Sequence, residues 1–97
     1  MEKIIKIDVC KGRHEMPCDM YVFDSIEDPT NVEEIEKEAK TFFYKNFFNE
    51  GVKKFKIYVT GLTVALIAVM KAADRYCDSI VLMHYDTKTG KYYSQEI

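Results

Sequence analysis

Proline and glycine are scarce in this chain. Its 97 residues include two prolines and four glycines, while 47% of the residues are hydrophobic. A disordered linker or low-complexity tail is usually rich in proline or glycine and too poor in apolar residues to form a core. We therefore expect residues 1–97 to fold throughout as a single domain.

Positive charge and long apolar runs are also in short supply. Fourteen Lys and Arg face sixteen Asp and Glu, so the formal net charge is -2. Binding of duplex nucleic acid depends on a strong positive field, so duplex DNA or RNA is not an expected partner. The longest apolar stretch, residues 57–70, is interrupted by polar residues and glycine. It is shorter than the roughly 20 residues that span a bilayer. No membrane contact is expected.

Cysteines are few and odd in number: Cys10, Cys18 and Cys77. The first residues, MEKIIKIDVCKG, lack the continuous apolar core and cleavage site of a signal peptide. These features predict a reduced, cytoplasmic protein. Cys10, His14 and Cys18 form a C-x-x-x-H-x-x-x-C series, for which zinc binding is one interpretation. The other is a loop with two small buried thiols, because structural zinc normally takes four ligands.

Hydrophobic periodicity predicts five strands. Ile5, Ile7 and Val9 alternate with charged residues, which predicts a strand with one face in solvent. A second strand is predicted over residues 21–23, joined to the first by a hairpin-like loop. Three further strands are predicted over residues 55–59, 80–85 and 91–97.

The first of two predicted helices covers residues 32–48. Thr30 and Asn31 are each followed three residues later by a glutamate, which is the spacing of a capping box. Tyr44 and Phe48 lie on the side opposite the apolar stripe of this helix. We expect a surface other than the core to pack against these two aromatic residues.

The second predicted helix covers residues 63–76. Its first two turns, VALIAVM, have no polar face, and a helix that is apolar all round is buried on more than one side. Because so short a chain offers only one sheet, we expect the second side to pack against another subunit. The prediction is a homo-oligomer, either a dimer or a tetramer.

The elements follow the order strand, strand, helix, strand, helix, strand, strand. The strand–helix–strand unit over residues 55–85 should cross over right-handed with its two strands parallel. We therefore predict an α/β fold, more narrowly an α+β sandwich, in which two helices pack on a mixed, mainly five-stranded sheet. Its architecture is expected to be ferredoxin-like or Rossmann-like.

Ligands of parallel sheets gather at the carboxyl ends of the strands. The first such end is formed by Thr60, Gly61, Leu62 and Thr63. Its glycine allows close approach of a ligand, and the helix that follows offers unpaired amides to a phosphate or carboxylate. The alternative is that these residues are only the turn that connects a strand to a helix in any strand–helix–strand unit, since no Walker pattern is present.

The second strand end combines His84, Asp86 and Lys88, and it is expected beside the first. An imidazole, a carboxylate and a cation together suit the binding of a phosphodiester, the activation of water, or the binding of a divalent cation. Alternatively, residues 86–90 form only a hairpin turn in which Asp86 caps backbone amides, and His84 is a half-buried strand residue.

Residues 55–97 carry a family resemblance. The residues that support it are Thr60-Gly61, the apolar helix, Tyr85-Asp86, Lys88, Gly90 and Gln95. In order and spacing they resemble the small manganese-dependent CRISPR-associated ring nucleases, a ferredoxin-like family that linearises cyclic oligoadenylates. The resemblance implies that Asp86 is the functional aspartate, that Lys88 and Gln95 belong to the ligand site, and that manganese is the cofactor. Two family histidines have no counterpart here, one near the helix end at residues 75–77 and one after Gln95.

Two functions of different classes follow. The first is binding of a cyclic oligonucleotide in CRISPR-type antiviral defence, with slow metal-dependent phosphodiesterase activity as an added possibility. In it, Asp86 and His84 hold metal or orient water, while Gly61, Leu62 and Thr63 hold phosphate. The second is a non-catalytic accessory or inhibitor protein of a phage or mobile element that acts by protein contact.

Overall fold

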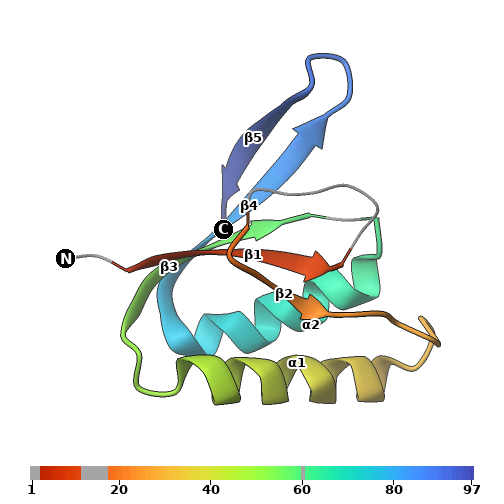
Figure 1. Cartoon of the computed structure of the whole chain (residues 1–97), viewed down its shortest axis with the longest axis vertical. Coiled ribbons are helices and arrows are strands. Elements are labelled where there is room, and N and C mark those ends of the chain that lie inside the picture. The colour runs from red at the N-terminus through yellow and green to blue at the C-terminus, as the bar shows by residue number, and fades with distance from the viewer. Residues whose placement is uncertain (1–2, 12–17, 60) are drawn as a thin grey trace.

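The computed structural model describes residues 3–11, 18–59 and 61–97. The elements are β1 (Ile4–Cys10), β2 (Met20–Phe23), α1 (Val32–Phe47), β3 (Val52–Tyr58), α2 (Thr63–Ala73), the short 3-10 helix η1 (Asp74–Tyr76), β4 (Cys77–Asp86) and β5 (Lys91–Glu96). This is the predicted order of strands and helices, and the two helices pack on one five-stranded mixed sheet (Figure 1). The predicted α/β sandwich is confirmed.

The strand order in the sheet is β2-β1-β3-β4-β5. The first four strands are parallel and only β5 is antiparallel, paired with β4. The predicted hairpin-like link between β1 and β2 is therefore wrong, because these two strands run in the same direction. Residues 11–19 connect them, and at about 3.3 Å per residue that segment is long enough to return along the whole of β1.

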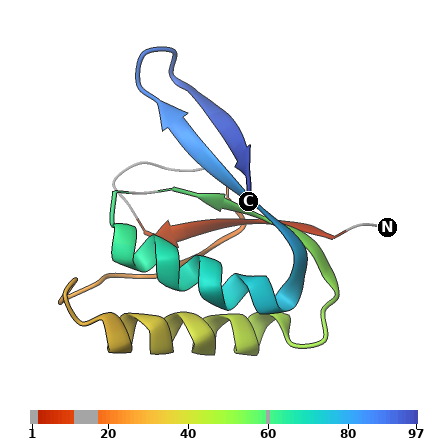
Figure 2. The ribbon, with the colours of Figure 1, turned by 180° about the vertical axis from the view of Figure 1, so that it is seen from behind.

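Both helices lie on one face of the sheet, and the β4–β5 hairpin extends beyond its edge (Figures 1 and 2). The core lies between these layers. Phe43 of α1 is fully buried, and its ring centroid lies 5.3 Å from that of Phe55 on β3. The buried residues of α1 recur every four positions, at Ile35, Ala39, Phe43 and Phe47. This spacing turns one stripe of the helix towards the sheet.

Two sides of the apolar helix α2 are covered by other parts of the same chain. Its buried residues are Ala65, Ala68, Val69, Ala72 and Ala73. The small alanine side chains allow α1 to lie alongside, and Lys71 of α2 reaches Glu36 of α1 at 2.8 Å. The cover that we expected from a second subunit is thus largely supplied by α1. Ile67 is the large side chain of α2 that remains outside, 49% exposed. No helix of the described residues is long and apolar enough to cross a membrane.

The alternation in β1 predicted that the opposite face of the sheet is exposed to solvent. In the structure, part of this face is buried. Asp8 is only 4% exposed. It lies beside Tyr58 in the register of β1 and β3, and the Tyr58 ring packs 5.0 Å from that of Tyr92. Burial raises the pKa of the Asp8 carboxyl, and its Oδ1 has no hydrogen-bond partner among the described residues. Tyrosines from neighbouring strands therefore cover a carboxylate in the middle of this face.

Candidate functional site

The first predicted strand end leads from β3 into α2. Gly61 and Thr63 are exposed there and Leu62 is half-buried, whereas Thr60 lies outside the described residues. Leu62 is the N-cap residue of α2, and no side chain of the described residues caps this helix. A Cβ atom added at Gly61 would meet nothing within 4 Å. The first backbone amides of α2 are therefore accessible, because Gly61, just before the N-cap, has no side chain to fill the space in front of them.

The second strand end extends further along the sheet than the first. Tyr58, the last residue of β3, pairs with Met83, and the Val59 amide donates to the Met83 carbonyl at 2.9 Å. His84 comes next, but Asp86 lies three residues beyond Met83, about 10 Å further along an extended strand. The structure thus brings His84 to the end of β3 and places Asp86 and Lys88 at the hairpin tip (Figure 1).

Asp86 is held by the turn that it starts. Its Oδ1 accepts a hydrogen bond from the Lys88 backbone N–H at 2.9 Å, and its Oδ2 accepts one from the Thr89 hydroxyl at 3.1 Å. Its carbonyl accepts the Gly90 amide at 2.8 Å, and Gly90 adopts a positive φ of 71°. This is the geometry of the capped-turn interpretation, in which the carboxylate organises residues 86–90.

His84 contacts Gln95 across the hairpin. The His84 Nε2 and Gln95 Oε1 atoms are 2.8 Å apart, and the imidazole stacks on the Tyr93 ring with centroids 5.1 Å apart. An amide oxygen only accepts, so with this amide orientation Nε2 carries a proton, and in the neutral imidazole Nδ1 is then an acceptor. The predicted site residue His84 therefore contacts Gln95, a residue of the ring nuclease resemblance, whereas the Asp86 carboxylate is bonded within its own turn.

The cysteine series is only partly described, because His14 lies outside the described residues. Cys10 and Cys18 are both half-buried, and burial raises the pKa of both thiols. The negative charge of Asp8 raises the same two pKa values further. Within residues 3–11, 18–59 and 61–97, no three His, Cys, Asp or Glu side chains gather as a metal site.

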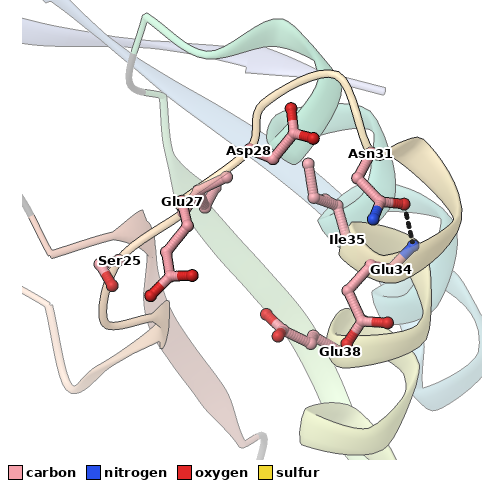
Figure 3. A pocket seen from close by; sticks show the side chains of 8 residues that line it. Ser25, Glu27, Asp28, Asn31, Glu34, Ile35 and Glu38 are labelled. Carbon is pink, nitrogen blue, oxygen red and sulfur yellow. Dashed lines mark hydrogen bonds between the residues drawn. The ribbon is translucent and has the colours of Figure 1, made fainter.

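Sequence reasoning did not find a groove at the amino end of α1. Its volume is about 410 Å³, and it lies between the loop after β2 and the first turns of the helix (Figure 3). Four acidic side chains surround it: Glu27, Asp28, Glu34 and Glu38. Asn31 caps α1 here by accepting the Glu34 amide, and Asp28 accepts both the amide and the hydroxyl of Thr30. These bonds lower the pKa of Asp28. The acidic lining does not suit an anionic ligand.

No known protein family, curated protein or solved structure matches this chain. The site is therefore interpreted from its own residues.

Proposed function

We propose that this protein binds a small cyclic oligonucleotide at the carboxyl ends of β3 and β4, as part of CRISPR-type antiviral defence. The observation that carries the proposal is the uncapped amino end of α2 behind Gly61. The first amides of a helix have no partner within it, and they carry a partial positive charge that favours a phosphate. In α1 a side chain takes up one such amide, since Asn31 accepts from Glu34 at 3.2 Å.

The hairpin adds the groups that an oligonucleotide needs beyond one phosphate. Lys88 and Lys91 are exposed, and neither forms an ion pair with a described residue. His84 presents its free Nδ1 as an acceptor and a ring that already stacks on Tyr93. Aromatic rings of this kind also stack on nucleobases. Lys88 and Gln95 of this hairpin belong to the set whose order resembles the ring nucleases, and that resemblance supports a cyclic ligand in particular.

Binding is proposed as the main activity, ahead of cleavage. A manganese ion would activate a water molecule for hydrolysis. Each Asp86 carboxylate oxygen already accepts one hydrogen bond, from Lys88 or from Thr89, which leaves one lone pair on each oxygen for a metal ion. His84 alone leaves one imidazole nitrogen for a metal. Among the described residues no group of three His, Cys, Asp or Glu side chains gathers here, and no hydrolytic step is assigned to them.

Calorimetric titration with a panel of cyclic oligonucleotides, with and without manganese, tests the proposal. We expect saturable binding that Lys88→Ala weakens about tenfold, equivalent to about 1.4 kcal/mol. Lys40→Ala is the matched control, because Lys40 is an exposed lysine on α1. Absence of heat with every cyclic ligand, from a folded protein, would reject the proposal. Linear product in the chromatogram would show that cleavage occurs as well.

One observation favours the alternative of a non-catalytic protein that acts by protein contact. Tyr44 on α1 and Phe48, the C-cap residue of that helix, are 58% and 56% exposed, and their ring centroids lie 5.1 Å apart. A pair of large aromatic side chains in solvent is typical of an interaction surface. A second copy of the chain, as in a dimer or tetramer, or another protein would cover it. This alternative predicts no nucleotide binding and an Asp86→Ala variant with unchanged activity.

A further inference from the structure

Three lysines lie side by side on the sheet face that the helices do not cover. They are Lys6 on β1 and Lys54 and Lys56 on β3, and we call them the lysine strip. Their neighbours Ile7, Phe55 and Ile57 are buried in the core on the helix side. Both helices lie on one face of the sheet (Figures 1 and 2). Because side chains alternate along a strand, the lysine strip belongs to the other face.

The register places two of these positive charges next to each other. Lys6 is the direct partner of Lys56, and Lys54 lies one row away beside Ile4. Like charges directly opposite each other in a sheet are destabilising. All three lysines are half-buried, so their aliphatic stems lie along the strands while the ammonium groups reach solvent.

None of the three lysines of the strip has a carboxylate within 4.0 Å of its ammonium group among the described residues, although Asp8 lies on the same sheet face two residues after Lys6. Four other lysines do have a carboxylate partner within 4.0 Å: Lys3, Lys11, Lys53 and Lys71. Asp19 lies close to Lys6, but its carboxylate accepts the Lys6 backbone amide at 2.9 Å. In an acidic chain of net charge -2, three neighbouring lysines without an ion pair indicate a surface for a negatively charged partner.

Exposed aromatic rings lie on the same face. Tyr21 of β2 is 41% exposed and pairs in register with Asp8, two residues after Lys6. Tyr85 of β4 is 51% exposed, and it lies two residues after Met83, the partner of Tyr58. Residues two positions apart on a strand point to the same face, so both rings lie on the face of the lysine strip. The Tyr92 ring, 5.2 Å away, supports Tyr85.

We infer that this open face binds single-stranded nucleic acid, with phosphates on the lysine strip and bases stacked on Tyr85 and Tyr21. Lysines that track a backbone, combined with tyrosines that stack on bases, are the general means of recognising a single strand. Duplex has few unstacked bases to offer, and three cations are too few to hold it. The lysine strip is distinct from the amino end of α2, and of the residues used here only Tyr85 lies at the carboxyl end of β4, so the inference goes beyond the proposed function.

Fluorescence anisotropy with a labelled 12-nucleotide single-stranded RNA, measured over a range of potassium chloride concentrations, tests the inference. Three phosphate contacts predict that log K falls with log salt with a slope of about -2, and that Lys56→Gln or Lys6→Gln reduces the slope by about 0.7. Tyr85→Ala should weaken binding about fivefold or more through lost stacking. Lys40→Gln, on the helix side, should leave both quantities unchanged.

The inference fails if the folded protein does not bind the RNA at low salt, or if Lys40→Gln weakens binding as much as Lys56→Gln. Titration of Lys56→Gln with the cyclic oligonucleotide separates the two proposals. Unchanged affinity for the cyclic ligand, together with weaker RNA binding, supports an independent surface. Normal RNA binding by both lysine-strip variants would contradict the inference and leave the proposed function as it stands.

Discussion

Asp86 holds the β4–β5 turn, and two of the three hydrogen bonds that it accepts there use its carboxylate. Removal of the carboxylate should therefore affect stability before it affects any chemistry. We expect Asp86→Ala to lower the free energy of unfolding by about 1–2 kcal/mol, at roughly 1 kcal/mol for each lost bond. Asp86→Asn retains the oxygen that accepts the Lys88 amide and should cost less. Urea unfolding of both variants measures this difference, and equal midpoints for Asp86→Ala and wild type would show that the turn needs no carboxylate.

Asp8 makes stability depend on pH. Burial raises the pKa of its carboxyl above the ordinary value of 3.8, so the folded protein holds this proton to a higher pH than the unfolded chain does. The stabilisation is complete below pH 3.8 and is lost as the pH rises through the folded-state pKa.

We expect Asp8→Asn to remove this dependence. Relative to the variant, the wild type should lose stability between pH 4 and pH 7, and at pH 7 the variant should be more stable by about 1 kcal/mol, since no buried charge remains. Urea unfolding at both pH values measures the difference in stability. The contributions of all other carboxyl groups cancel, because the two proteins share them. A stability difference that does not change with pH would contradict a buried, titrating Asp8.

At the scale of elements, the amino end of α2 has two features that variants can separate: an open position at Gly61 and the absence of a side-chain cap. Gly61 has no positive φ, and an added methyl group would meet no atom within 4 Å among the described residues beyond its chain neighbours. Gly90, in contrast, has a φ of 71° in the β4–β5 turn. The first glycine is therefore not required by the fold, whereas the second is.

We expect Gly61→Ala to leave stability unchanged, or to raise it by about 0.5 kcal/mol, and to weaken binding of a cyclic oligonucleotide by tenfold or more, because the methyl group occupies the space of the ligand. Gly90→Ala should lower stability by about 1 kcal/mol through its left-handed backbone. Thermal unfolding and calorimetric titration of both variants separate these effects. Unchanged affinity in Gly61→Ala would place the ligand elsewhere.

The elements themselves were largely predictable, because each depends on local periodicity. Alternation identified most of the strands, and apolar residues at three- and four-residue spacing identified α1. The direction of β2 was not predictable, because the pattern of four residues is the same whether the strand pairs parallel or antiparallel. The extent of β4 was also underestimated: it begins at Cys77 and ends at Asp86, since pairing with β3 and β5 extends it past its apolar centre.

At the scale of the whole molecule, the two helices share one face of the sheet, and side chains on both the outer helix surface and the open sheet face remain uncovered. This arrangement explains why the site was only partly predictable. His84 and Gln95 meet because antiparallel pairing in the hairpin follows from the short turn between the strands. The separation of Asp86 from the end of β3 depends on strand lengths, which side-chain chemistry does not determine. The burial of Asp8 depends on tyrosines from strands distant in sequence.

The outer surface of α1 provides a test of assembly. If Tyr44 and Phe48 form the contact of a dimer or tetramer, Phe48→Glu should give a monomer, measured by light scattering after size exclusion. At concentrations where the wild type is also fully dissociated, the free energy of unfolding per chain should lie within about 0.5 kcal/mol of wild type. Phe43→Glu is unsuitable for this purpose, because Phe43 is fully buried in the core. An unchanged mass for Phe48→Glu would exclude this surface from the assembly contact.

The central claim is that a phosphate-bearing ligand binds at the amino end of α2, and it is tested most directly by amide chemical shifts during titration with a cyclic oligonucleotide. The claim predicts saturable shifts at Gly61, Leu62, Thr63 and the Lys88 amide, with small shifts along the outer face of α1. Shifts confined to α1, or no shifts at ligand concentrations well above that of the protein, would contradict it.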